Sequence, residues 1–200
     1  MKDSFEPVIR VFRQHHGVMR SSQVFEQGIQ PRTLYQMRDA GLLIQDGRGL
    51  YRLAGEQVWS DPDLAVVSLR IPKGVICLVS ALYFHQITTQ IPHEVHVALP
   101  KDSEKPRIEY PPVRFFWISP KPFRAGIETY EKDHVTIKVY GVAKTIADCF
   151  KFRNRLGMDI ALEALREGLR QKKCTPTEIQ TFARVNRVER IMLPYLEAMA

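Results

Sequence analysis

Cysteine is scarce in this chain, and long hydrophobic runs are absent. Only three of the 200 residues are cysteine. Cys77, Cys149 and Cys174 lie far apart, so the sequence has neither a disulfide framework nor the closely spaced ligands of a zinc site. No stretch approaches the roughly eighteen apolar residues of a membrane-spanning helix, and the first residues do not resemble a signal peptide. We therefore expect a cytoplasmic protein with no membrane partner and no metal.

Catalytic motifs are also absent. The sequence contains no glycine-rich phosphate loop, no HExxH and no GxSxG. His93 and His96 have two residues between them, and on a strand this odd offset places them on opposite faces. Lys138 lacks the Asp/Glu-x-Lys context of a metal-dependent nuclease. We predict no catalytic residue and no cofactor, and a nucleic-acid-processing enzyme is the less favoured alternative.

Positive charge is in excess. The chain has 29 lysines and arginines against 22 aspartates and glutamates, a formal net charge of +7, and an isoelectric point near 9.4. This balance favours polyanionic partners, although net charge alone does not distinguish nucleic acid from a membrane surface. With 44% hydrophobic residues the chain can bury a sizeable core, and its length suits one or two domains.

Residues 17–53 have the start and stop signals of two short helices. Ser21 is placed to cap a helix that Gly28 ends, because glycine tolerates the left-handed conformation at a helix end. Pro31 stands where a second helix begins, since its missing N–H costs nothing in the first turn, and Gly41 ends that helix. Apolar residues at positions 5, 8, 9 and 12 predict an amphipathic helix that completes a three-helix core.

A hairpin follows these helices. The Asp46-Gly47 step lies between apolar residues at 43–44 and 50–53, a strong signal for two antiparallel strands. A helix-turn-helix followed by a hairpin with Arg48 at its tip is a winged helix, a shape that places one helix in a DNA groove. We predict this DNA-binding domain over residues 1–55.

The exposed face of the second helix follows from about 100° of rotation per residue. Leu34 and Met37 define the buried side, so Arg32, Tyr35, Gln36 and Asp39 lie opposite, flanked by Thr33 and Arg38. Arginine and glutamine read guanine and adenine edges, and threonine or tyrosine adds phosphate contacts. Phosphates repel Asp39, so it either accepts from a cytosine amine or points to solvent. The predicted DNA-binding residues are Ser21, Arg32, Thr33, Tyr35, Gln36, Arg38 and Arg48.

The remainder predicts an α+β domain over residues 63–200, with a small sheet flanked by helices. Trp59, in a connector at 55–62, is expected to pack between the domains. Helices are predicted at 63–70 and 75–87, strands at 93–99, 113–118, 127–130 and 135–140, a loop at 101–112, and helices over most of the tail, one starting at a capping box at 175–178.

For two segments of this second domain, a functional role and a structural role are both considered. The aromatic run 113–118, with Lys121 and Arg124 nearby, is either a nucleic-acid surface or, as we favour, part of the core. In the first tail helix, Lys144, Asp148, Lys151 and Arg155 are predicted to form a polar face opposite Ile146, Cys149, Phe150 and Leu156. We expect Asp148 to make a hydrogen bond between its helix and a loop rather than act as a catalytic acid.

The combination of motifs resembles a known family. Residues 17–53, with G-V-M-R-S-S-Q-V, P-R-T-L-Y and G-R-G-L-Y-R-L, closely resemble the N-terminal domain of AbiEi-type antitoxins, the regulators of type IV toxin–antitoxin systems. Residues 79–82, 93–99 and 142–149 are similar to landmarks of that family's C-terminal domain and occur in the same order. Gln30 departs from the family, which usually has a serine or threonine cap at that position.

The resemblance implies a function. It implies a repressor whose N-terminal domain binds double-stranded operator DNA and autoregulates its own operon. It also implies an antitoxin whose C-terminal domain counteracts a nucleotidyltransferase-like toxin encoded beside it, with direct contact left open. The alternative is a winged helix that serves as a protein-interaction module without DNA binding, its charged residues forming a solvated face.

Overall fold

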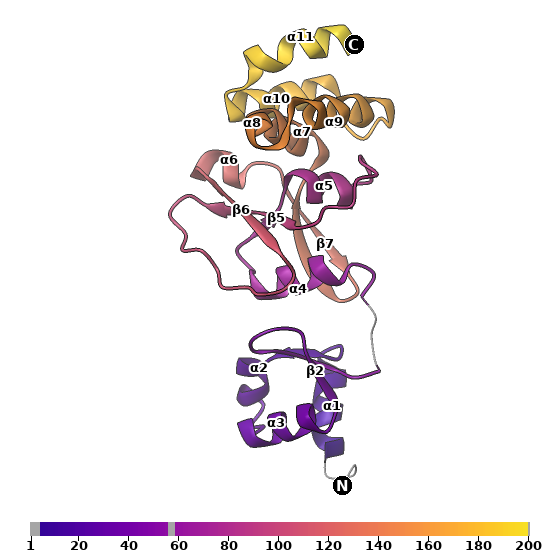
Figure 1. The fold of residues 1–200 in the computed structure, drawn as a ribbon, viewed down its shortest axis with the longest axis vertical. Coiled ribbons are helices and arrows are strands. Elements are labelled where there is room, and N and C mark those ends of the chain that lie inside the picture. The colour runs from indigo at the N-terminus through magenta and orange to yellow at the C-terminus, as the bar shows by residue number, and fades with distance from the viewer. Residues whose placement is uncertain (1–4, 56–58, 200) are drawn as a thin grey trace.

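The computed structural model describes residues 5–55 and 59–199 and has two domains arranged along its long axis (Figure 1). A mainly helical N-terminal domain with a small sheet precedes a second domain in which helices cover a larger sheet (Figure 1). The predicted α+β fold class is thereby confirmed. The domain boundaries at residues 55 and 63 stay a prediction, and residues 56–58 of the connector lie outside the described residues.

Within residues 5–55, the N-terminal domain contains three helices and three short strands. In chain order they are α1 (Glu6–Gln14), β1 (Val18–Arg20), α2 (Ser21–Glu26), α3 (Pro31–Asp39), β2 (Leu43–Gln45) and β3 (Leu50–Leu53). The strands form an antiparallel sheet in the order β1-β3-β2. The predicted three-helix core is present, because Phe12, Val24 and Leu34, one from each helix, are fully buried in one cluster.

Two details of this domain differ from the prediction. Residues 18–20 form an edge strand on β3, so the sheet has a third strand besides the predicted hairpin. The extended backbone continues to Arg20, which becomes the N-cap of α2 and whose N–H donates to Gln23 at 2.8 Å. Ser21 is therefore the first helical residue and not the cap. Its own N–H donates to the Gly49 carbonyl at 2.9 Å.

The second domain begins with a mixed α and β region. Its elements are α4 (Pro62–Arg70), β4 (Val75–Ile76), α5 (Leu78–Phe84), β5 (Val95–Pro100), β6 (Val113–Ile118), α6 (Pro120–Arg124), β7 (Ile127–Lys132) and β8 (Val135–Tyr140). They form a sheet in the order β6-β5-β4-β8-β7. Strand pairs β5–β6 and β4–β8 are parallel, and the other two pairs are antiparallel.

Helices form the rest of the second domain. They are α7 (Val142–Lys151), α8 (Arg153–Leu156), α9 (Met158–Arg170), α10 (Pro176–Asn186) and α11 (Glu189–Met199). The predicted capping box starts α10: the Thr175 hydroxyl accepts from the Glu178 N–H at 3.2 Å, and the Glu178 carboxylate accepts from the Thr175 N–H at 2.7 Å.

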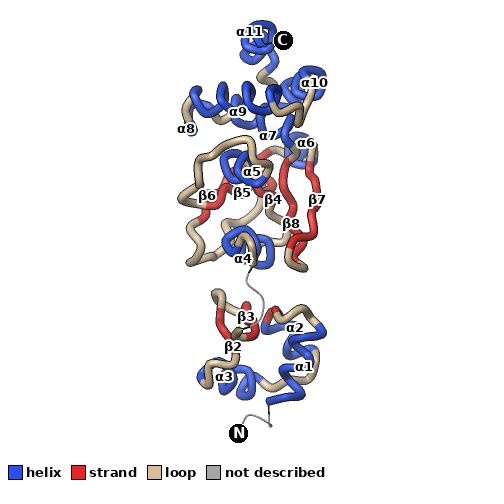
Figure 2. Tube along the Cα trace, turned by 90° about the vertical axis from the view of Figure 1, so that its right-hand side faces the viewer, coloured by secondary structure: helices blue, strands red, loops and turns tan. Residues whose placement is uncertain are grey.

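The five-stranded sheet is buried on both faces. Successive residues of a strand point to opposite sides, so Ile76 and Val97 pack with α4 while Ala98 and Phe116 pack with α5 and the tail helices. Figure 2 shows α4 and α5 on opposite sides of the sheet. The second domain therefore consists of a sheet between two helical layers, and α4 is the layer that faces the N-terminal domain (Figure 1).

Two predictions for the second domain are wrong. Val75 and Ile76 belong to the central strand β4, and helix α5 begins only at Leu78. Lys144 and Asp148, assigned to a polar face, are 0% and 1% exposed. In contrast, the core interpretation of residues 113–118 fits the structure, since Phe115, Phe116 and Ile118 are buried and only Trp117 is exposed among the aromatic residues.

Candidate nucleic-acid interface

The turn between α2 and α3 sets the direction of α3. Gly28 has a φ of +78° and follows the C-cap of α2. Its N–H donates to Phe25 at 2.9 Å, and the N–H of Ile29 donates back to Val24 at 3.3 Å, which closes the end of α2. Pro31 then occupies the first helical position of α3, as predicted. The short glycine-containing turn between two helices is typical of a helix-turn-helix.

The exposed face of α3 is the one that the periodicity predicts. Leu34 and Met37 are both 0% exposed and form part of the N-terminal core. Arg32, Tyr35 and Gln36 are exposed, and Thr33 and Arg38 are partly exposed on the flanks. These side chains remain exposed in the whole structure, so no described part of either domain covers this face. Figure 1 places α3 on the side of the N-terminal domain away from the second domain.

Asp39 on α3 forms an ion pair with its neighbour Arg38. The Arg38 guanidinium donates from Nε and Nη2 to Asp39 Oδ1 at 2.9 and 2.7 Å. This hydrogen bond is the main cause that raises the pKa of Arg38 above its usual value. Arg38 also lies 5.3 Å from the ring centre of Tyr35. Asp39 therefore neutralises Arg38, and Arg32 is the exposed cation of α3 without an ion-pair partner among the described residues.

The hairpin after α3 is braced by a second ion pair. Nε of Arg52 on β3 lies 2.6 Å from Oδ2 of Asp46, and the two side chains are 25% and 17% exposed. Gly47 and Gly49 have φ angles of +115° and +74°, which glycine adopts readily. Arg48 lies between them at the tip, where its side chain is exposed. Arg48 thus stands on a fixed turn with no ion-pair partner in the part of the chain that the structure describes.

The hairpin tip lies toward the second domain. A Cβ atom at Gly47 would be 2.5 Å from Nη1 of Arg70 in α4. Ser21 is at the same end of the domain, because its Oγ would lie 3.1 Å from a Cβ at Gly49. The predicted DNA-binding residues thus form two groups, one on the outer face of α3 and one, Ser21 and Arg48, beside the hairpin. Whether either group contacts DNA stays a prediction.

The junction between the domains contains aromatic contacts. Trp59 is 5% exposed, as expected of an interdomain packing residue, and the Arg52 guanidinium lies 5.9 Å from its ring centre. The imidazole rings of His16 and His134 are stacked, with centres 4.0 Å apart and planes 6° apart. These contacts join the N-terminal domain to the second domain on the side opposite the exposed face of α3.

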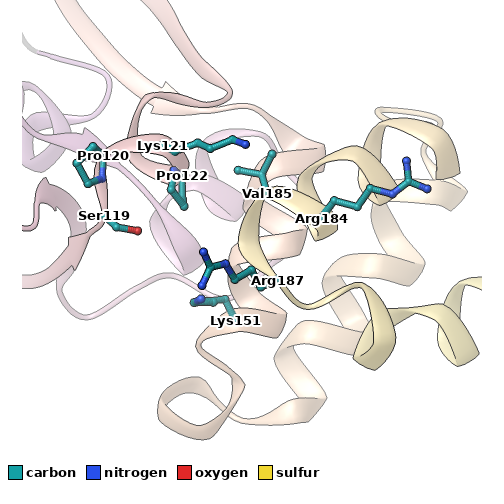
Figure 3. A pocket seen from close by; sticks show the side chains of 8 residues that line it. All are labelled: Ser119, Pro120, Lys121, Pro122, Lys151, Arg184, Val185 and Arg187. Carbon is teal, nitrogen blue, oxygen red and sulfur yellow. The ribbon is translucent and has the colours of Figure 1, made fainter.

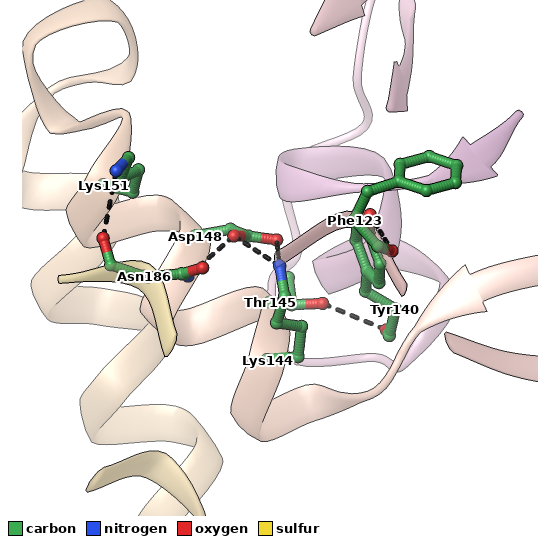
Figure 4. A network of polar contacts seen from close by, with 7 residues as sticks. All are labelled: Phe123, Tyr140, Lys144, Thr145, Asp148, Lys151 and Asn186. Atoms are coloured by element: carbon green, nitrogen blue, oxygen red, sulfur yellow. Dashed lines mark hydrogen bonds and ion pairs between the residues drawn. The ribbon is translucent and has the colours of Figure 1, made fainter. Parts of the chain in front are cut away.

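A buried polar network connects two helices of the second domain (Figure 4). Lys144 Nζ lies 2.6 and 2.5 Å from the carboxylate oxygens of Asp148, and Nδ2 of Asn186 on α10 donates to Asp148 at 2.8 Å. Burial raises the pKa of Asp148, while Lys144 and Asn186 oppose that rise. Asp148 thus makes hydrogen bonds within α7 and to another helix, and not to a loop as predicted. Nothing in the local sequence indicates the pairing with Asn186.

Neither a metal centre nor a membrane span is found in the described part of the chain. Residues 5–55 and 59–199 contain no group of three or more His, Cys, Asp or Glu side chains placed to hold a metal ion. None of the helices described is both long enough and apolar enough to cross a membrane. Cys77, Cys149 and Cys174 are buried and free.

The N-terminal geometry agrees with a family comparison. Residues 6–54 match the AbiEi_4 family. The description of this family is "Transcriptional regulator, AbiEi antitoxin". The match spans α1 to β3 and confirms the resemblance for the N-terminal domain, about a quarter of the chain. The resemblance of residues 79–82, 93–99 and 142–149 to the AbiEi C-terminal domain lies outside the matched residues and stays a prediction.

A solved structure has a similar fold over almost the whole chain. The crystal structure of the RV2827C protein from Mycobacterium tuberculosis aligns with a TM-score of 0.61, covering 98% of this chain and 81% of that chain. The two sequences are 13% identical, so the likeness shows a shared fold. No curated protein matches the chain.

Proposed function

We propose that the protein is a transcriptional repressor that binds double-stranded operator DNA through the exposed face of α3. The match of residues 6–54 to a family of transcriptional regulators and antitoxins supports this function. One observation carries the finer proposal: Arg32, Tyr35 and Gln36 face solvent on the second helix of a helix-turn-helix, and neither domain covers them.

The dimensions of α3 suit a major groove. Its nine residues give a length of about 13 Å, and the groove is about 12 Å wide. Arg32 and Gln36 are one turn apart, about 6 Å along the axis, so both can reach base edges within the same groove. We assign base reading to Arg32 and Gln36 and phosphate contacts to Thr33, Tyr35 and Arg38.

The hairpin residues are assigned separately from α3, because the hairpin tip lies toward the second domain. Ser21 and Arg48 lie together beside the hairpin tip, apart from α3. We assign both to the DNA backbone or minor groove flanking the site that α3 reads, because a short hydroxyl and an exposed arginine are common phosphate ligands. Arg38 contributes less than its charge suggests, since Asp39 already neutralises it.

Alanine variants tested on two DNAs separate base reading from simple attraction. Arg32→Ala and Gln36→Ala are each expected to lose about 1–3 kcal/mol on the promoter and much less on scrambled DNA. Arg166→Ala is the matched control, an exposed arginine on α9 in the other domain. Equal losses on both DNAs would reassign Arg32 to a phosphate contact. No binding of the intact protein to its own promoter at low salt would favour the protein-interaction module.

We further infer that the protein is an antitoxin that counteracts a nucleotidyltransferase-like toxin encoded beside it. The antitoxin description of the matched family supports this inference. The second domain, which does not carry α3, is a separate part of the protein that can perform this function. We propose that the protein acts by binding, without catalysis, in the cytoplasm. Co-expression tests this: an Arg32→Ala/Gln36→Ala variant should still neutralise the toxin although it no longer represses. Co-purification of the two proteins would show direct contact.

A further inference from the structure

A cavity lies between α6 and the C-terminal end of α10, in the domain that does not carry α3. Its volume is about 670 Å³, and it is lined by Ser119, Lys121, Pro122, Lys151, Arg184 and Arg187, among others. Small-molecule sites in proteins have volumes of about 300–1,000 Å³. In Figure 3, Lys121, Lys151 and Arg187 extend into the space between the two helices.

The lining of this cavity is basic and contains no acidic residue. Lys121 and Arg187 make no ion pair or side-chain hydrogen bond with any residue in 5–55 or 59–199. Lys151 donates one N–H to the Asn186 carbonyl at 3.0 Å and keeps its other donors free. Arg184 differs, because it donates to Glu189 at 2.8 Å and points away from the other cations (Figure 3). Lys121, Lys151 and Arg187 therefore have no ion-pair partner in residues 5–55 and 59–199.

Arg187 is one of seven non-glycine residues with a positive φ among the described residues. Arg187 has φ and ψ of 60° and 38°, the left-handed conformation. The hydrogen bonds Arg187 N–H to Arg184 O, at 3.1 Å, and Val188 N–H to Ala183 O, at 2.8 Å, form a Schellman motif, in which glycine normally occupies this position. An arginine here costs free energy that glycine would not. Arg187 thus ends α10 at the edge of the cavity, where its side chain and Lys151 both line the wall (Figure 3).

We propose that this cavity binds a small polyphosphate, such as a nucleoside triphosphate, through its phosphate groups. Lys121, Lys151 and Arg187 supply three positive charges for the phosphate oxygens, and Arg187 offers a planar fork suited to bidentate contact. Pro120, Pro122 and Val185 give the apolar surface on which the rest of such a ligand can lie. The concave shape and size favour a small molecule over a duplex. The site is independent of the proposed DNA contacts.

Titration of the full-length protein with a fluorescent ATP analogue tests the proposal, with inorganic tripolyphosphate as the competitor. Arg187→Gly and Lys121→Gln should each weaken binding about tenfold or more, because each removes a charged hydrogen bond. Arg184→Gln is the matched control: it neutralises a cation of the same lining that is already paired with Glu189, so binding should change little. Tripolyphosphate should displace the analogue, since the contacts are to phosphates.

Arg187→Gly also serves as a control for misfolding. Glycine relieves the left-handed backbone, so this variant should melt at or above the temperature of the parent while binding less. Its promoter binding should be unchanged, which keeps this test separate from the proposed repressor function. No binding of ATP or tripolyphosphate at millimolar concentration would overturn the proposal. Equal losses in Arg184→Gln, or binding of a single-stranded oligonucleotide that neither compound displaces, would overturn it too.

Discussion

The buried ion pair of α7 offers a test of how the second domain is held together. Lys144→Met keeps the length of the side chain but removes the ammonium that contacts both oxygens of Asp148. Both residues are almost fully buried, so water cannot replace the lost partner. The carboxylate would keep its hydrogen bond from Asn186, 2.8 Å away, but would lose its counter-charge.

The expected loss is large relative to ordinary protein stability. Removing one partner of a buried pair costs about 3–5 kcal/mol. Because Asn186 still donates to Asp148, we expect the lower end of that range, about 3 kcal/mol. A loss of about 3 kcal/mol lowers the melting temperature of a protein of this size by roughly 6–12 °C. Lys144→Met/Asp148→Asn should recover more than half of the loss, since it removes the charge and leaves an amide oxygen for Asn186.

The loss should depend on pH in a direction that can be worked out. Burial raises the pKa of Asp148 above its usual value of 3.8, and removal of Lys144 raises it further. A carboxyl with a raised folded-state pKa favours the folded state fully at pH below the unfolded pKa, and this contribution is lost as pH rises through the folded pKa. The destabilisation of Lys144→Met is therefore smallest near about pH 4 and grows toward neutrality.

Urea denaturation of the parent, of Lys144→Met and of Lys144→Met/Asp148→Asn is carried out at about pH 4 and at neutral pH. It measures the stability loss of the single variant, the recovery in the double variant and the pH dependence of the loss. Tryptophan fluorescence reports the transition, since Trp117 lies in the second domain and Trp59 at the junction. The reasoning is refuted if Lys144→Met is equally destabilised at both pH values. It is also refuted if the double variant is as unstable as the single one, because the loss would then be one of packing.

Three further predictions concern Asp39 on α3, Arg48 at the hairpin tip and the buried His96. Asp39→Asn should raise affinity for promoter and scrambled DNA alike, about threefold to tenfold, and steepen the salt dependence by about one phosphate contact, because it frees Arg38; a loss of sequence preference instead would mean that Asp39 reads a base. Arg48→Ala should weaken binding to both DNAs and reduce the salt slope by about one, measured by titration at several salt concentrations; a loss confined to the promoter would contradict a backbone contact. Burial lowers the pKa of His96 from 6.5 to about 4, so the unfolded chain takes up a proton before the folded protein does, and the free energy of unfolding falls by up to about 3 kcal/mol as pH falls between those values. In urea denaturation, His96→Leu should remove this part of the acid destabilisation. An unchanged dependence of stability on pH would contradict the prediction.

Features with a local cause were predictable from the sequence. The exposed face of α3 follows from the spacing of Leu34 and Met37, and helix starts follow from Pro31 and the capping box at Thr175. The hairpin follows from the Asp46-Gly47 step. In each case a few neighbouring residues determine the backbone, so no knowledge of the tertiary structure is needed.

Features that depend on distant partners were not predictable. Strands β1 and β4 have three and two residues, too few to show an alternating pattern, and they exist because β3, β5 and β8 pair with them. Lys144 and Asp148 are charged residues whose burial depends on Asn186 in another helix. The cavity is lined by residues of α6, α7 and the end of α10, which lie far apart in the sequence.

Footprinting of the intact protein on its own promoter, beside a titration of scrambled DNA at the same salt concentration, tests the DNA-binding function most directly. We predict protection of a discrete segment and a preference for the promoter of about a thousandfold or more. The Arg32→Ala/Gln36→Ala variant should lose most of that preference and keep its weak affinity for scrambled DNA. Equal affinity of the intact protein for both DNAs, with no protected segment, would contradict sequence-specific repression through α3.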